Sequence, residues 1–243
     1  MLRRRVVTAV VLAVLVLWGV FGLPPLPFAL VVGAILALGA WEWARLARFR
    51  AGGARTVYAL LTAAVMAVIY GPLTAAGAVL IALLFLALLW WVAALAAVLR
   101  FPVGSGLWRR GSATAVAGLC VLVPAWAALT EIHRTAGPAY VLVLLLLVWA
   151  ADIGAFFAGR RWGRHKLAAA VSPGKTVEGL LGALAATLVV AGGAMAWLSL
   201  GPAFALVCVL AVLASVLGDL VESMFKRLAD LKDSGSLLPG HGG

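Results

Sequence analysis

The acidic side chains of this sequence gather near its C-terminal end. The chain has eight Asp and Glu residues, and half of them lie between Asp219 and Asp233, where a long apolar run gives way to charged residues. An ionised acid within an apolar run is costly unless it is paired, binds a metal or faces water. Carboxylate oxygens, together with phosphate oxygens, are ligands that suit Mg²⁺. The pattern therefore predicts that Asp219 and Glu222 hold Mg²⁺, although Glu222 could instead pair with Lys226 one helical turn later.

Asp152 is a second acid within an apolar run, in the stretch VWAADIGAFFAGR. We expect its carboxylate to face the same cavity as Asp219. The alternative is an acid at the edge of a helix whose side chain reaches out to water.

The segment SPGKT, residues 172–176, has residue types that suit a phosphate group. A Walker site would need Gly where Ala169 stands, and no strand is expected before the segment, so that motif is excluded. A simpler role remains, with Lys175 as a point charge for phosphate and Ser172 and Thr176 as hydroxyl donors. A helix is expected to begin near Val177, and its N-terminal amides also favour an anion.

The elements that position these residues are predicted to be membrane helices. The composition is 65% hydrophobic and 11% charged, far from that of a soluble domain. Apolar runs of about twenty residues recur along the chain, and in lipid such runs must be helical. We therefore expect an all-α, polytopic membrane protein with about eight transmembrane helices. The apolar segments are residues 6–22, 26–46, 56–70, 73–99, 112–130, 139–158, 177–200 and 203–221.

Charge placement supports this count and gives an orientation. With eight spans, 18 of the 19 Lys and Arg residues fall on one side, and only Arg134 falls on the other. The positive-inside rule then places both termini in the cytoplasm. The compact length without a soluble extension suggests a bacterial form, and hence the inner (plasma) membrane. The net charge of +11 follows from this topology, so we expect no nucleic-acid partner. The third segment is short, and the third and fourth could form one re-entrant unit.

We divide the chain into two regions. Residues 1–135 form an N-terminal set of helices. Residues 136–243 form the region with the chemistry, which includes a cytosolic loop at 159–177 and a C-terminal motif at 215–243. The topology brings this loop and this motif to the same, cytoplasmic side of the membrane.

The C-terminal stretch resembles phosphatidate cytidylyltransferases, the CDP-diacylglycerol synthase family. The family pattern reads S-x-x-K-R, four residues, K-D-x-G, three residues and P-G-H-G-G. The matching positions are Ser223, Lys226, Arg227, Lys232, Asp233, Gly235, Pro239, Gly240, His241, Gly242 and Gly243. The blocks around Asp152 and VSPGKTVEG look similar to the same family. In the family, further Asp residues and a final helix follow the last glycines, so the resemblance implies that this sequence is truncated.

The resemblance implies an enzyme that joins CTP to phosphatidate and releases pyrophosphate, with Mg²⁺ as cofactor. It implies Asp219, Lys226 and Asp152 as catalytic residues, and Asp219, Asp152 and Glu222 as metal ligands. The implied substrate-binding residues are Ser172, Lys175, Thr176, Arg227, Lys232, Asp233 and His241. The implied partners are CTP, phosphatidate, other anionic lipids and the membrane, with a possible homodimer.

Two other functions remain open from the sequence. A different CTP-dependent membrane enzyme, such as a lipid kinase, would share the nucleotide site and differ in the lipid. A transporter would use Asp152 and Asp219 as coupling sites, but such sites usually lie near the middle of the bilayer, and these acids lie toward one edge.

Overall fold

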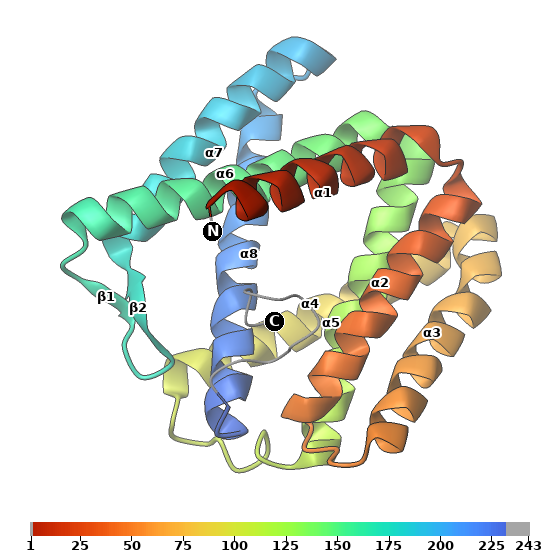
Figure 1. Cartoon of the computed structure of the whole chain (residues 1–243), viewed down its shortest axis with the longest axis vertical. Helices are drawn as coiled ribbons and strands as arrows, with labels where there is room; N and C mark the ends of the chain where they lie inside the picture. The colour runs from red at the N-terminus through yellow and green to blue at the C-terminus, as the bar shows by residue number, and fades with distance from the viewer. Residues whose placement is uncertain (1, 232–243) are drawn as a thin grey trace.

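The computed structural model describes residues 2–231 and confirms an all-α architecture (Figure 1). Eight α-helices, one π-helical turn and one short β-hairpin make up the described part of the chain. In chain order these are α1 (Leu2–Gly22), α2 (Pro25–Leu46), α3 (Gly52–Ala75), α4 (Gly77–Arg100), α5 (Gly111–Glu131), the π-turn Ile132–Ala136, α6 (Pro138–Trp162), β1 (Lys166–Ala168), β2 (Ser172–Thr176), α7 (Val177–Leu198) and α8 (Ala203–Leu228).

Seven of these helices, α2 to α8, are long and apolar enough to cross a membrane, and α1 carries a shorter apolar stretch, Val11–Gly22. Many large apolar side chains point outward, such as Val189, which is 77% exposed. An apolar exterior of this extent suits contact with lipid. The chain is therefore a polytopic membrane protein, in agreement with the prediction.

The third and fourth predicted segments are two separate helices. The helix α3 begins four residues before the predicted segment and continues past Tyr70, with Pro72 inside its last turn. It ends at Ala75, and the extended residue Ala76 separates it from α4. The short apolar run at 56–70 therefore underestimates α3, because glycine and proline residues at its two ends lower the local hydropathy signal.

Helices α2, α3 and α5 form one packed group, held together by aromatic side chains that bond to backbone carbonyls of a neighbouring helix. Trp43 Nε1 donates to Thr114 O at 2.8 Å, and Tyr58 OH donates to Ala115 O at 2.7 Å. The side chains of Trp43 and Tyr58 both reach Gly118, where any Cβ would collide with them. These contacts bury the polar ends of the aromatic rings with their hydrogen bonds satisfied.

Helices α6 and α7 make the closest helix crossing in the C-terminal half. A Cβ at Gly182 would collide with Ala158 Cβ and the carbonyl of Gly154, and a Cβ at Gly154 would collide with the carbonyl of Gly182. Small residues allow the backbones of membrane helices to approach in this way. The crossing sets the position of Asp152, which lies two residues before Gly154 on α6.

The predicted cytosolic loop at 159–177 consists of the end of α6 and a short hairpin. Helix α6 continues to Trp162, and the strands β1 and β2 then pair antiparallel, with Lys166 opposite Thr176. Between the strands, Val171 is only 1% exposed and packs into the cluster that contains Phe225 of α8. This buried side chain anchors the hairpin to α8 and holds Lys175 over the helix bundle.

Apolar packing crosses the predicted division at 135/136. Val20 of α1 and Phe28 of α2 pack with Val141 of α6, and Ala94 of α4 belongs to the same cluster as Leu220 of α8. The helices on either side of that position are therefore in direct contact.

Candidate active site

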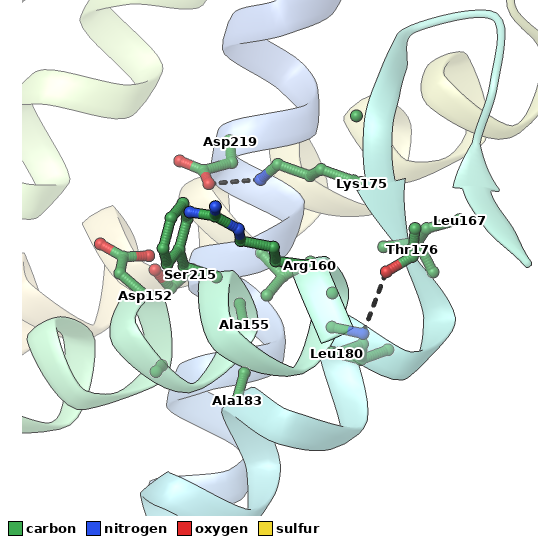
Figure 2. Close-up of a pocket in the computed structure, with 16 residues that line it drawn as sticks. Asp152, Ala155, Arg160, Leu167, Lys175, Thr176, Leu180, Ala183, Ser215 and Asp219 are labelled. Atoms are coloured by element: carbon green, nitrogen blue, oxygen red, sulfur yellow. Dashed lines mark hydrogen bonds and ion pairs between the residues drawn. The ribbon is translucent and has the colours of Figure 1, made fainter. Parts of the chain in front are cut away.

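A cavity of about 450 Å³ lies between α6, β2, α7 and α8 (Figure 2). Its walls are largely apolar, and a small set of polar side chains converges on it. The polar side chains are those of Asp152, Arg160, Lys175, Thr176, Ser215 and Asp219. An apolar cavity with a few convergent charged groups is the usual form of a ligand site.

Asp219 and Lys175 form an ion pair across this cavity. Asp219 projects from α8, and Lys175 reaches it from β2, as Figure 2 shows. The Asp219 side chain is 53% exposed and that of Lys175 is 27% exposed, so the pair remains accessible. The predicted acid and the predicted phosphate-binding cation are thus direct neighbours, although 44 residues separate them in the sequence.

Helix α6 brings a second acid and a second cation to the same cavity. Asp152 and Arg160 lie eight residues apart, which places them on one side of the helix two turns from each other. The Arg160 guanidinium lies over the ring of Phe156, 5.9 Å from its centroid. The two acids and two cations of the cavity therefore come from three different elements.

The start of α7 is tied to the end of α6. Thr176 is the N-cap of α7, and its Oγ1 accepts a hydrogen bond from Gly179 N at 3.1 Å. Glu178 accepts from the backbone amides of Arg164 and His165, and lies 2.6 Å from Nδ1 of His165. These contacts fix the strand end that carries Lys175, so Glu178 has a positioning role.

Glu222 and Lys226 do not line this cavity. They form the ion pair that the sequence offered as the alternative, with Lys226 Nζ 3.2 Å from Glu222 Oε1. Glu222 lines a different cavity, of about 290 Å³, together with Glu42 and Trp43 of α2. Residues 219 and 222 are about 60° apart around a helix axis. The cavity that Asp219 lines is bounded by α6, the hairpin and α7, whereas the cavity that Glu222 lines is bounded by α2, α4 and α5.

Two more predicted substrate-binding residues lie near the hairpin but outside the cavity lining. Arg227 Nε donates to the carbonyl of Val171, at 3.4 Å, and so joins the end of α8 to the hairpin turn. Ser172 is the first residue of β2. The remaining predicted substrate-binding residues, Lys232, Asp233 and His241, lie outside the described residues.

Sequence reasoning did not select Arg160 or Ser215 as site residues. Ser215 is four residues before Asp219, so helical spacing alone predicts that the two share a face. Arg160 belongs to a basic cluster, Arg160 to Lys166, in which the sequence does not distinguish one cation from another. Only the α6–α7 crossing shows that Arg160 points into the cavity.

The carboxylates of this cavity suit a divalent cation that is coordinated partly by the protein and partly by a substrate. Within residues 2–231, no three His, Cys, Asp or Glu side chains gather to hold a metal by themselves. Mg²⁺ usually takes one or two carboxylates and completes its shell with water and substrate phosphates. Asp152 and Asp219 supply two carboxylates, and Lys175 and Arg160 add cations for phosphate oxygens.

A second cavity of about 390 Å³ adjoins the first, and its lining is almost wholly apolar. It lies between the end of α4, the hairpin, α7 and α8, and it shares Leu167, Leu180 and Val216 with the charged cavity. The arrangement places an apolar cavity directly beside the one that carries the charged side chains. A molecule with a phosphate head and a hydrocarbon tail would fit both together.

Comparison with known proteins agrees with this chemistry. The chain matches the cytidylyltransferase family over residues 3–243. It is 44% identical to a phosphatidate cytidylyltransferase of Pseudomonas aeruginosa, over all of this chain and 90% of that protein. It is 39% identical to one of Haemophilus influenzae, over all of this chain and 92% of that protein. One of Staphylococcus saprophyticus is 45% identical over 45% of this chain and 44% of that protein.

Proposed function

The chain belongs to the cytidylyltransferase family, and we propose that it is the membrane enzyme that makes CDP-diacylglycerol from CTP and phosphatidate. The observation that carries this proposal is the cavity in which Asp152, Asp219, Lys175 and Arg160 converge. The apolar compartment beside it suits an acyl chain of the lipid substrate. The relatives that match the whole chain carry the same activity in their names.

The reaction is a displacement at phosphorus. A phosphate oxygen of phosphatidate forms a bond to the α-phosphorus of CTP, the bond from that phosphorus to the bridging oxygen breaks, and pyrophosphate leaves. Such transfers depend on positioning and on neutralising negative charge rather than on covalent help from the protein. Lys175, at the end of β2, and Arg160, on α6, supply positive charge to the cavity.

Mg²⁺ is part of this proposal, with Asp219 and Asp152 as the residues that hold it. When bound, the cation would neutralise phosphate oxygens of CTP and pyrophosphate. Lys175 is paired with Asp219 across the cavity, so the entry of a phosphate group gives Lys175 a second partner. Glu222 lies in another cavity, and its proposed role is to hold Lys226 in place through their ion pair.

The orientation proposed for the enzyme follows the distribution of positive charge. The N-terminus, the hairpin and the end of α8 face the cytoplasm, where CTP is found, and the π-turn with Arg134 faces the opposite side of the inner membrane.

A homodimer is consistent with the large apolar exterior, of which α4 forms part.

Asp219→Asn tests the function and the metal role together. Membranes with the chain are incubated with labelled CTP, Mg²⁺ and phosphatidate, and CDP-diacylglycerol is measured. We expect the unmodified chain to form product only with Mg²⁺, EDTA to abolish it, and Asp219→Asn to lower it at least about a hundredfold. Glu131→Gln, which likewise neutralises an acid without changing its size and removes only a pair with Arg134, is the matched control.

Two results would contradict the proposal in different ways. Near-normal product from Asp219→Asn would remove the metal role but leave the function. If a panel of lipid phosphates and alcohols gave a CTP-dependent product only with a lipid other than phosphatidate, the substrate assignment would be wrong.

A further inference from the structure

A third cavity, of about 350 Å³, lies away from the candidate active site and is rich in arginine. It is formed by the end of α2, the connection to α3, the first turn of α3 and the C-terminal end of α8. Its lining is Arg45, Arg48, Phe49, Arg50, Arg55, Ala229, Asp230 and Leu231, none of which lines the active-site cavity.

Two of the four arginines are held in place by backbone carbonyls. Arg48 Nη2 donates to Leu228 O at 2.7 Å, and Arg55 Nε donates to Phe49 O at 2.9 Å. The Arg55 guanidinium also lies over the ring of Trp41, 5.5 Å from its centroid. A guanidinium has five N–H donors, so each of these contacts orients the group and leaves donors for another acceptor.

The lining has a formal excess of three positive charges, since Asp230 is its one acid. Asp230 lies 4.0 Å from Arg48, and its side chain is 86% exposed, so it neutralises little of this charge. Membrane topology alone requires only that basic residues lie on the cytoplasmic side of the membrane. It does not require four of them to surround one cavity with two of their guanidinium groups fixed.

We propose that this cavity binds a phosphate group, most directly that of an anionic lipid headgroup. Arginine forks match phosphate oxygens, and the cavity lies at the end of one candidate membrane span, α2, and the start of the next, α3. Basic pockets at the cytoplasmic ends of membrane helices hold lipid headgroups in this way. The site is separate from the one at which phosphatidate reacts, so it adds a second phosphate-binding position to the chain.

Occupancy of this cavity would act on the end of α8. Arg48 bonds to the carbonyl of Leu228, the last residue of α8, and the same helix carries Asp219 two and a half turns earlier. A bound phosphate would draw Arg48, Arg45 and Arg50 together around that helix end. The ligand therefore stabilises the C-terminal end of the helix that contributes Asp219 to the active-site cavity.

The test compares two variants that lose the same charge. Arg45→Gln/Arg50→Gln removes two arginines of the cavity and spares Arg48 and Arg55, whose bonds support the fold. Arg109→Gln/Arg110→Gln removes two adjacent arginines before α5, outside the cavity. The full chain is purified in neutral detergent, and its affinity for short-chain phosphatidylglycerol, for phosphatidylcholine of equal chain length and for inorganic phosphate is measured by calorimetry.

We expect phosphatidylglycerol to bind the unmodified chain, and Arg45→Gln/Arg50→Gln to weaken this binding about tenfold or more, because hydrogen bonds to charged groups are lost. Arg109→Gln/Arg110→Gln should change it less than twofold, and formation of CDP-diacylglycerol should persist in both variants. If inorganic phosphate shows the same dependence and the lipid does not, the site serves a free phosphate. Equal weakening in both variants, or in neither, would overturn the proposal.

Discussion

At the scale of single residues, the position of Lys175 distinguishes it from the other cations of its hairpin. Lys175 lines the active-site cavity and pairs with Asp219, whereas Lys166 lies on the neighbouring strand, is exposed and does not line the cavity. We expect Lys175→Gln to lower kcat/KM for CTP about a hundredfold, since a cation beside the reacting phosphates is lost. Lys166→Gln should change it less than threefold in the same assay of CDP-diacylglycerol.

Lys175→Arg completes this comparison. It keeps the charge but changes the shape of the cationic group, so we expect part of the activity to return. Similar losses from Lys175→Gln and Lys166→Gln would mean that the hairpin acts only through its net charge.

The sequence identifies which residues are candidates for the site better than it predicts which side chains they will meet. Asp219, Asp152 and Lys175 are unusual for their surroundings and can be selected from the sequence alone, and the structure brings all three to one cavity. Glu222 is equally unusual, but its direction depends on which helices pack on each side of α8. That information lies in contacts between residues far apart in the chain, which a single sequence does not contain.

At the scale of elements, the crossing of α6 and α7 at Gly154 and Gly182 predicts that added methyl groups on α7 change stability in opposite directions, depending on where they lie. Gly182→Ala would place a Cβ against Ala158 and the backbone of α6, and such overpacking costs about 1–3 kcal/mol. Gly192→Ala on the same helix meets nothing within 4 Å, so only the better helix propensity of alanine remains. Thermal unfolding in detergent should show a lower Tm for Gly182→Ala and an equal or higher Tm for Gly192→Ala.

The same pair of variants tests whether this crossing positions the active site. Gly182→Ala should also raise KM for CTP, because Asp152 and Arg160 both lie on α6. A fall in Tm from both variants would show that α7 tolerates no added side chain anywhere, and the special role of the crossing would then be wrong.

Helices and strands could be predicted from the sequence where the pattern that indicates them extends over many residues. Apolar runs located the eight described helices, because a membrane span must satisfy its backbone internally, although the run at 56–70 is shorter than α3. The hairpin was missed because its strands have three and five residues, and SPGKT contains Pro and Gly, which are typical of turns. Its strands are held by the burial of Val171 against α8, a contact that no local pattern reveals.

At the scale of the whole molecule, the distribution of cations predicts which end of the bundle faces the cytoplasm. The test uses single cysteines in a chain in which Cys120 and Cys208 are replaced by alanine. Thr135, in the π-turn, and Ala169, in the hairpin turn, are both exposed and lie at the two predicted faces. A membrane-impermeant maleimide should label Thr135→Cys in intact spheroplasts and should label Ala169→Cys only after the membrane is opened.

The physical basis of this expectation is that an eight-span topology puts 18 of the 19 Lys and Arg residues on the side of the hairpin, and moving them across the membrane would oppose the potential. Formation of CDP-diacylglycerol by each cysteine variant is the control that the bundle is intact. Labelling of Ala169→Cys before the membrane is opened would invert the orientation. The active-site cavity would then face away from the cytoplasmic CTP, so the same result would also contradict the proposed enzyme.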